Sequence, residues 1–281
     1  MLSYRHAFHA GNHADVLKHI VLLPIAEYMA EKPAPFWIID THAGAGRYAL
    51  DSAHAAKLAE FRDGIGRLWD KKGLPPAAVD YVEFVKMLNP DGQLRHYPGS
   101  PWLASQLLRE SDRLRLYELH STDLKLLQEC FKTAGRQVTV NASDGFAGLK
   151  AILPPPPRRA LVLIDPSYET LDDYVNVVKG LQEALKRFAT GTYAVWYPML
   201  TKLESRKLPD RLKRLGAANW LHVTLEVRAP ASAGFGMNGS GMFIINPPWT
   251  LEKTLHETLP KLTSLLAQGD GAKFTLESES A

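Results

Sequence analysis

The chain has 281 residues, of which 46% are hydrophobic and 22% are charged, as in an ordinary folded protein and unlike a disordered or fibrous one. Its single cysteine, Cys130, excludes an internal disulfide and a zinc site built from several cysteines, and it favours a reducing cytoplasm. The net charge of +3 allows a nucleic-acid partner without requiring one, no apolar run reaches the roughly 18 residues of a membrane span, and no signal peptide is expected.

Short β-type runs alternate with helical stretches along the chain. A helix is predicted over 12–32, begun by Asn12 or Asp15, and Pro24 is expected to kink or divide it. Seven strands separated mostly by helices predict an α/β fold, with a mostly parallel sheet covered by helices on both faces. The tail 276–281 is expected to fray. The first strand begins the stretch 35–50, in which a glycine turn and a helix are predicted to follow it. The other strands lie within 114–120, 137–145, 159–169, 192–198, 222–229 and 241–249.

The spacing after the glycine turn predicts an insertion. In dinucleotide-binding folds an acidic residue ends the second strand roughly 20 residues beyond the glycine turn. Here the first acid in such a place is Glu118, far beyond Gly46. We therefore predict that residues 51–95 form a small helical insertion subdomain, and that 1–50 and 96–281 form the main domain.

Three features at the ends of predicted strands suggest a nucleotide-like ligand. Gly44 and Gly46 in DTHAGAGRYA (40–49) let a backbone approach a ligand closely, although a purely structural turn explains them equally well. Glu118 could accept both hydroxyls of a ribose, and Asp144 could accept from an adenine amino group. A surface glutamate and a turn aspartate are the simpler alternatives. Because the carboxyl ends of parallel strands meet at one crevice, the three together predict a ligand site.

The stretch LVLIDPSYET (161–170) runs an apolar strand directly into a carboxylate. An exocyclic aromatic amine is a poor nucleophile, because its lone pair is delocalised into the ring. Asp165 and the Pro166 carbonyl could accept its hydrogens and so favour the pyramidal nitrogen that attacks an alkyl donor. Pro166 also fixes φ and removes a donor, and Tyr168 offers a ring on which a planar base can stack. The alternative is a proline-initiated loop capped by Asp165.

Two other motifs also resemble functional sites, and the first of them, judged alone, is a better match than the Asp165 stretch. FIINPPWT (243–250) also runs a strand into a polar residue, prolines and an aromatic ring, but it lies on the last predicted strand, so we interpret residues 246–249 as a structural turn. His9 and His13 have the spacing of two metal ligands on a helix face. Neither an H-E-x-x-H motif nor a cysteine partner accompanies them, and no metal site is predicted.

The segment 4–19 is nevertheless expected to line a cofactor pocket with its polar residues and to meet a polyanion with its aromatic and basic ones. Lysines and arginines recur farther along the chain. Most of them are expected to form a solvated face and some a rim that binds a nucleic-acid backbone. They are Arg158, Arg159, Lys202, Arg206, Lys207 and the stretch 211–214.

Several motifs, taken in order, resemble the RlmJ family of bacterial 23S ribosomal RNA methyltransferases, which modify an adenine N6. The resemblance covers residue 1 to about 265 and implies a class I, Rossmann-like methyltransferase fold, S-adenosyl-L-methionine as cofactor and the helical insertion. The motifs are MLSYRHAFHAGNHADVLKH, DTHAGAGRY, YPGSP, ELH, DGF, LVLIDPSYE, RFATGTYAVWYP and INPPW.

Matched by position, the resemblance implies roles for individual residues. Asp165 would be the catalytic acid, helped by Pro166 and Tyr168, and Tyr4, Arg5, His6 and Tyr168 would bind substrate. The family motif reads Asp-Pro-Pro-Tyr, and Ser167 here replaces the second proline. Activity is expected to survive this change, whereas loop rigidity and base selectivity are left open. The implied cofactor contacts are Lys18, His19, His42, Gly44, Ser100, Glu118, Asp144, Gly145 and Asp165.

The residues alone leave alternatives open. The Asp-Pro-x-Tyr constellation suits any exocyclic amine, so methylation of DNA adenine N6 or guanine N2 is the first alternative. A nucleic-acid-binding module without turnover, used in DNA utilisation, is the second. The resemblance favours 23S ribosomal RNA, naked rather than assembled, as the partner of a cytoplasmic monomer, but it does not identify the target nucleotide.

Overall fold

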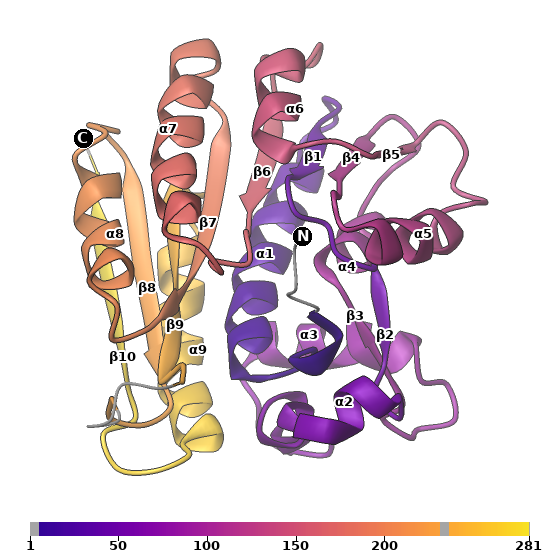
Figure 1. Cartoon of the computed structure of the whole chain (residues 1–281), viewed down its shortest axis with the longest axis vertical. Coiled ribbons are helices and arrows are strands. Elements are labelled where there is room, and N and C mark those ends of the chain that lie inside the picture. The colour runs from indigo at the N-terminus through magenta and orange to yellow at the C-terminus, as the bar shows by residue number, and fades with distance from the viewer. Residues whose placement is uncertain (1–5, 231–235, 281) are drawn as a thin grey trace.

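The computed structural model describes residues 6–230 and 236–280, and its centre is an eight-stranded sheet in the order β10-β8-β9-β7-β6-β1-β4-β5 (Figure 1). The pairs β1–β4, β1–β6, β4–β5 and β6–β7 are parallel, whereas β9 runs antiparallel to β7 and β8, and β10 antiparallel to β8. The strands are β1 (Trp37–Asp40), β4 (Arg113–Tyr117), β5 (Val138–Asn141), β6 (Ala160–Ile164), β7 (Thr192–Met199), β8 (Trp220–Glu226), β9 (Gly239–Ile245) and β10 (Lys273–Glu279).

The prediction of seven strands was one short, because the tail forms β10 instead of fraying. β10 pairs with the whole of β8, from Lys273 opposite Glu226 to Glu279 opposite Trp220. Side chains tie it further: the Thr224 and Thr275 hydroxyls are 2.7 Å apart, and Lys213 Nζ lies 2.6 Å from Glu277 Oε2. A mostly polar strand at a sheet edge carries little hydrophobic signal in its sequence.

Helices cover both faces of the sheet, as predicted. On β6 the side chains alternate: Leu161 and Leu163 join one apolar cluster, and Val162 and Ile164 join the other. The first cluster includes residues of α1 (His13–Glu31), α4 (Ser100–Gln106), α5 (Ser121–Cys130) and α9 (Leu251–Leu266), and the second those of α6 (Gly145–Ile152), α7 (Leu171–Arg187) and α8 (Leu203–Lys213). Buried on both faces, the central strands need the continuous apolar runs that the sequence shows.

Helix α1 begins after Asn12, whose side chain accepts from the N–H groups of Ala14 and Asp15. Pro24 was expected to kink or divide it: the helix is continuous through that residue, so it is not divided, and the kink stays a prediction. Its flanking residues Leu23 and Ile25 are fully buried. This packing offsets the roughly 3 kcal/mol that an interior proline costs a helix.

A short strand, rather than the predicted helix, follows the glycine turn. This strand, β2 (Arg47–Ala49), pairs antiparallel with β3 (His96–Pro98), and the Gly99 N–H donates to the Gly46 carbonyl beside them. A partner about 50 positions away along the chain therefore overrides the local preference. Between the two strands lie the α-helices α2 (Ala53–Leu58) and α3 (Pro76–Met87) and the short 3₁₀ helices η2 (Glu60–Asp63) and η3 (Ile65–Arg67). That residues 51–95 form a separate subdomain stays a prediction.

No helix within 6–230 or 236–280 has the length and apolar character needed to cross a membrane.

Candidate functional site

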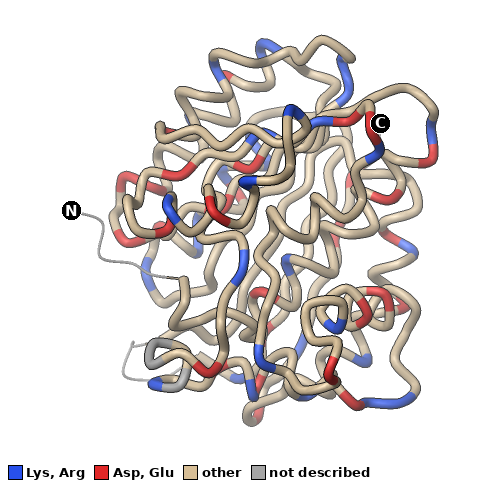
Figure 2. The backbone as a smooth tube through the Cα atoms, turned by 90° about the vertical axis from the view of Figure 1, so that its right-hand side faces the viewer, with Lys and Arg blue, Asp and Glu red and all other residues tan. Residues whose placement is uncertain are grey.

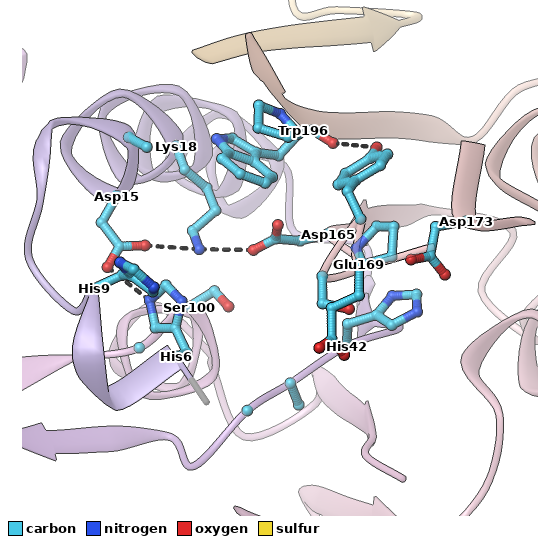
Figure 3. Close-up of a pocket in the computed structure, with 18 of the residues that line it drawn as sticks. His6, His9, Asp15, Lys18, His42, Ser100, Asp165, Glu169, Asp173 and Trp196 are labelled. Carbon is cyan, nitrogen blue, oxygen red and sulfur yellow. Dashed lines mark hydrogen bonds and ion pairs between the residues drawn. The ribbon is translucent and has the colours of Figure 1, made fainter. Parts of the chain in front are cut away.

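A cavity of about 650 Å³ opens along the carboxyl ends of the parallel strands. Its wall includes Gly44 after β1, Glu118 after β4, Asp144 after β5 and Asp165 after β6. The prediction that these strand ends meet in one crevice is confirmed. Figure 3 shows a close-up of this cavity with part of its lining residues.

The glycine turn is held by Glu118. Gly44 has φ +60°, and a Cβ on it would lie 2.3 Å from the Tyr48 hydroxyl, so only glycine fits here. The Gly44 N–H donates to Glu118 Oε2 at 2.8 Å, and the His120 N–H donates to Oε1 at 2.6 Å. Burial raises the pKa of Glu118. Each carboxylate oxygen still has a lone pair for a ligand hydroxyl.

Asp40 is a site residue that the sequence reasoning missed. It ends β1, is fully buried, and accepts from Ser100 Oγ at 2.6 Å and from the His42 N–H at 3.2 Å. Burial raises its pKa to about 6. Ser100 and His42, both expected to contact the cofactor, line the cavity and are therefore positioned by Asp40. The missed signal was the same as for Asp165, a carboxylate directly after the apolar run of WIID.

Asp144 and Gly145 both line the cavity, and both also have structural roles. Asp144 Oδ1 accepts from the Ala147 N–H at 2.7 Å and so caps α6. A Cβ on Gly145 would lie 2.1 Å from the Thr41 carbonyl oxygen, so glycine is required for α6 to pack against the turn after β1. The second carboxylate oxygen of Asp144 can therefore bind a ligand, whereas glycine is required at position 145 because the backbone of Thr41 packs against it.

A chain of charged groups connects α1 to Asp165 (Figure 3). Lys18 Nζ lies 2.7 Å from Asp165 Oδ2 and 2.8 Å from Asp15 Oδ1, and Asp15 Oδ2 lies 2.8 Å from His6 Nε2. Burial alone would lower the pKa of Lys18, but the two carboxylates raise it well above its usual value. Lys18 lines the cavity with its ammonium between these two carboxylates, and its expected contact with the cofactor stays a prediction.

The loop after β6 holds Tyr168 in an unusual conformation. Its φ is +54°, a left-handed value that costs a non-glycine residue about 1–3 kcal/mol. The Tyr168 hydroxyl donates to the Trp196 carbonyl at 2.6 Å, and its ring packs 4.7 Å from that of Tyr174. The ring lines the cavity but is 2% exposed. Stacking of a base on Tyr168 stays a prediction, and it requires this ring to be uncovered. Trp196, which also lines the cavity, lies in the motif RFATGTYAVWYP but was not among the expected site residues.

The remaining expected ligand residues differ in their position. His42 and His6 line the cavity. His19 is not among the residues that line the cavity: it is fully buried and its Nδ1 lies 2.8 Å from the Tyr97 hydroxyl, so its expected contact with the cofactor stays a prediction without support from its position. Tyr4 and Arg5 lie outside the described residues.

The two other motifs have structural surroundings. His9 Nδ1 lies 3.0 Å from Glu60 Oε2, and burial lowers the pKa of His13 to about 4. Asn246 Nδ2 donates to the carbonyls of Ala189 and Gly191, next to the start of β7. Because β9 is antiparallel to β7, this turn lies at the sheet edge opposite Asp165, which confirms its interpretation as structural.

The geometry agrees with the comparisons of the whole chain. A family model described as "Ribosomal RNA large subunit methyltransferase D, RlmJ" matches residues 33–277. The chain belongs to the RlmJ family. The resemblance of its motifs is thereby confirmed, and so is the class I methyltransferase fold.

Individual relatives match nearly end to end. A protein of Haemophilus influenzae named ribosomal RNA large subunit methyltransferase J is 49% identical over 278 residues, covering 99% of this chain and 98% of the relative. A protein of the same name from Escherichia coli K12 is 50% identical over 266 residues, covering 95% and 94%. The crystal structure of protein LPL1258 from Legionella pneumophila superposes with a TM-score of 0.89 at 35% identity, covering 97% of this chain and 99% of that one.

Proposed function

We propose that this protein transfers a methyl group from S-adenosyl-L-methionine to the N6 amine of an adenine in 23S ribosomal RNA. The observation that carries the proposal is the position of Asp165. Its carboxylate lies at the carboxyl end of β6, in the wall of the cavity, with Oδ2 held by Lys18. Its other oxygen has no hydrogen-bond partner among the described residues. Lys18 therefore fixes one oxygen of Asp165, and the other oxygen can accept a hydrogen bond from the target amine.

The residues near the glycine turn fit the cofactor. Because Gly44 has no Cβ, a ligand can approach the backbone closely there. Glu118 offers acceptor oxygens to the ribose hydroxyls. The second oxygen of Asp144 can accept from the adenine amino group. When bound, the cofactor supplies an electrophilic methyl group on a sulfonium. The cavity of about 650 Å³ has room for this cofactor and a nucleoside together.

Asp165 acts on the amine of the target base. Its free oxygen accepts a hydrogen of the amine, as does the Pro166 carbonyl, which receives no hydrogen bond from the described residues. The nitrogen lone pair is thereby withdrawn from the ring and aimed at the methyl group. As the N–C bond forms and the bond from that carbon to the sulfonium sulfur breaks, positive charge develops on the nitrogen, and the nearby carboxylate stabilises it. The surplus proton of the amine would then leave through the Asp165 oxygen that accepts it and pass to solvent. Lys18 acts as a positioning residue, because its two ion pairs hold the Asp165 carboxylate in place.

The substrate must present an unstacked base. A carboxylate within a cavity cannot reach an amine inside a duplex unless the base is flipped out, and RNA is read mainly at loops and unpaired ends. We therefore propose naked 23S RNA as the substrate and a monomer in the cytoplasm as the active form. DNA adenine methylation is the alternative with the same chemistry.

Methyl transfer from labelled cofactor distinguishes these substrates. We expect a short hairpin of 23S RNA to be methylated faster than duplex DNA at matched salt, because its loop base is already unstacked. Mapping the product in total RNA from a strain that lacks the gene then identifies the nucleotide. Faster turnover of duplex DNA would support the alternative.

Ser167 gives a test of the loop itself. Ser167 lines the cavity, and its hydroxyl and N–H have no hydrogen-bond partner among the described residues. Ser167→Pro should therefore remove no bond and should stiffen the loop before the base arrives. We expect kcat/KM for RNA to rise by about two- to five-fold, since ordering one residue costs about 1 kcal/mol. Cofactor affinity, measured by calorimetry, should not change. A loss of about tenfold or more would instead make Ser167 part of the substrate site.

A further inference from the structure

Helix α8 exposes a basic stripe on the surface of the protein. It is the outer helix beside α7 in Figure 1, and it buries Ser205, Leu208 and Leu212, which are spaced as one helix face. Lys202 directly precedes the helix, and Arg206 and Lys207 lie one turn farther along the opposite, exposed face. Because Leu208 and Leu212 are already used in the core, the exposed face offers mainly charge, with Leu203 as its one exposed large apolar residue among those described.

These charges lack partners within the protein. Among residues 6–230 and 236–280, no carboxylate forms an ion pair with Lys202, Arg206 or Lys207. Other basic side chains are paired: Arg187 Nε lies 3.1 Å from Glu183 and Lys213 Nζ lies 2.6 Å from Glu277. On the side of the molecule at β5, basic and acidic positions are interspersed (Figure 2). The start of α8 thus carries three cations without an ion pair, although Glu204 and Asp210 lie on the same helix.

The stripe begins two residues beyond a residue of the cavity wall. Met199, at the end of β7, pairs with Gly239 of β9, which pairs with Glu226 of β8, so the three lie in one row at the same edge of the sheet. Leu200, one residue beyond this row, lines the cavity, and Lys202 follows two residues later.

Arg228 continues the stripe into the cavity. It follows Glu226 by two residues, beyond the same edge of the sheet, and it is exposed and lines the cavity. Its guanidinium donates to the Met237 carbonyl at 3.4 Å and forms no ion pair with a described residue. The positive charge of Arg228 also lowers the pKa of His13, although burial lowers it more. Because His13 is the first residue of α1, this effect indicates that Arg228 lies close to that end of the helix.

We propose that Arg228, Lys202, Arg206 and Lys207, together called the basic track, bind the phosphate backbone of the RNA that flanks the target base. The inference rests on the proposed function, because it takes RNA as the substrate. Lys202 and Arg206 are four residues apart, about 6 Å along the helix axis, so the charges form a line rather than a single point. The track leads from the cavity wall to the outer surface, so it holds the strand while the base enters the cavity. Contacts to phosphates position a nucleic acid without reading its sequence.

Neutralising the outer part of the track tests the proposal. Arg206→Ala/Lys207→Ala removes two charges and keeps good helix formers. We expect the Kd for a 23S hairpin, measured by fluorescence anisotropy, to rise at least tenfold at low salt. The slope of log Kd against log salt should become shallower by about 1.4–2, because two phosphate contacts are lost. The KM for RNA should rise, with kcat and cofactor affinity unchanged. Arg228→Ala should weaken RNA binding in the same way.

A matched control carries the same loss of charge elsewhere. Lys150→Ala/Lys186→Ala removes two exposed lysines near the opposite sheet edge, in the last turns of α6 and α7, for which the described residues provide no ion pair. This control should bind the hairpin with the wild-type slope. Equal slopes for the control and the α8 variant would overturn the basic track while methylation of RNA by the wild-type protein upheld the function. Loss of hairpin binding in the α8 variant, with no methylation of RNA by the wild-type protein, would instead support the track and reject the proposed function. Tighter binding to anionic vesicles than to RNA through the same residues would also overturn the basic track.

Discussion

Asp165→Asn should fold, bind cofactor and lose most methyl transfer. The amide can still accept one hydrogen bond, but it lacks the negative charge that stabilises the developing positive charge on the amine. Removing one such preorganised electrostatic contact costs about 100- to 1,000-fold in kcat. Folding should survive because Lys18 keeps Asp15 as an ion-pair partner at 2.8 Å. Single-turnover methylation of an RNA hairpin measures the chemical step directly.

A neighbouring carboxylate serves as the control for this variant. Glu169 lies four residues farther along the same loop and also lines the cavity. Glu169→Gln removes the same charge without touching the reacting amine, and we expect its turnover to stay within about two-fold of wild type. Near-wild-type methylation by Asp165→Asn would reject the mechanism. Asn246 would not replace it, because its amide donates to two backbone carbonyls at the opposite edge of the sheet.

The positions of the site residues were predictable where their signal is local. Glu118 and Asp165 each follow an apolar strand directly, and all parallel strands present their carboxyl ends to one crevice. The same rule applied to Asp40 would have found it too. Such residues are recognised because the strand before them and the polar group after them lie within one short window of sequence.

Contacts between distant segments were not predictable in this way. The ion pair of Lys18 with Asp165 spans 147 positions, and nothing near Lys18 in the sequence indicates a second carboxylate. The burial of Tyr168 depends on Trp196, 28 positions away. The strand β2 exists because β3 pairs with it across the inserted helices. In each case tertiary contacts decide the role of a residue whose local sequence permits several.

The Lys18 pair also explains why α1 matters to the site. This helix is almost entirely buried, and its Lys18 and Asp15 meet the loop after β6 and the described N-terminal residue His6. Breaking a buried ion pair between a lysine and carboxylates is costly, because removing one partner leaves an uncompensated buried charge. The site is therefore held by one rigid helix on one side and by the strand ends on the other.

Glu118→Ala should weaken binding of S-adenosyl-L-methionine by about 10- to 150-fold, since hydrogen bonds to a charged group contribute about 1.5–3 kcal/mol. The structure adds a second effect, because Glu118 also accepts the N–H groups of Gly44 and His120 at 2.8 and 2.6 Å. Alanine therefore removes the ribose acceptor and loosens the glycine turn together.

Glu118→Gln separates the two effects. The amide keeps the shape of the side chain and one oxygen, which can still accept from one of the two N–H groups, while the charge is lost. If the ribose contact dominates, calorimetry should show a loss of affinity for Gln that approaches the loss for Ala. If support of the turn dominates, Gln should retain affinity close to that of wild type, and only Ala should lose it. Unchanged affinity in both variants would remove Glu118 from the cofactor site, and the ribose would then have to lie elsewhere in the cavity.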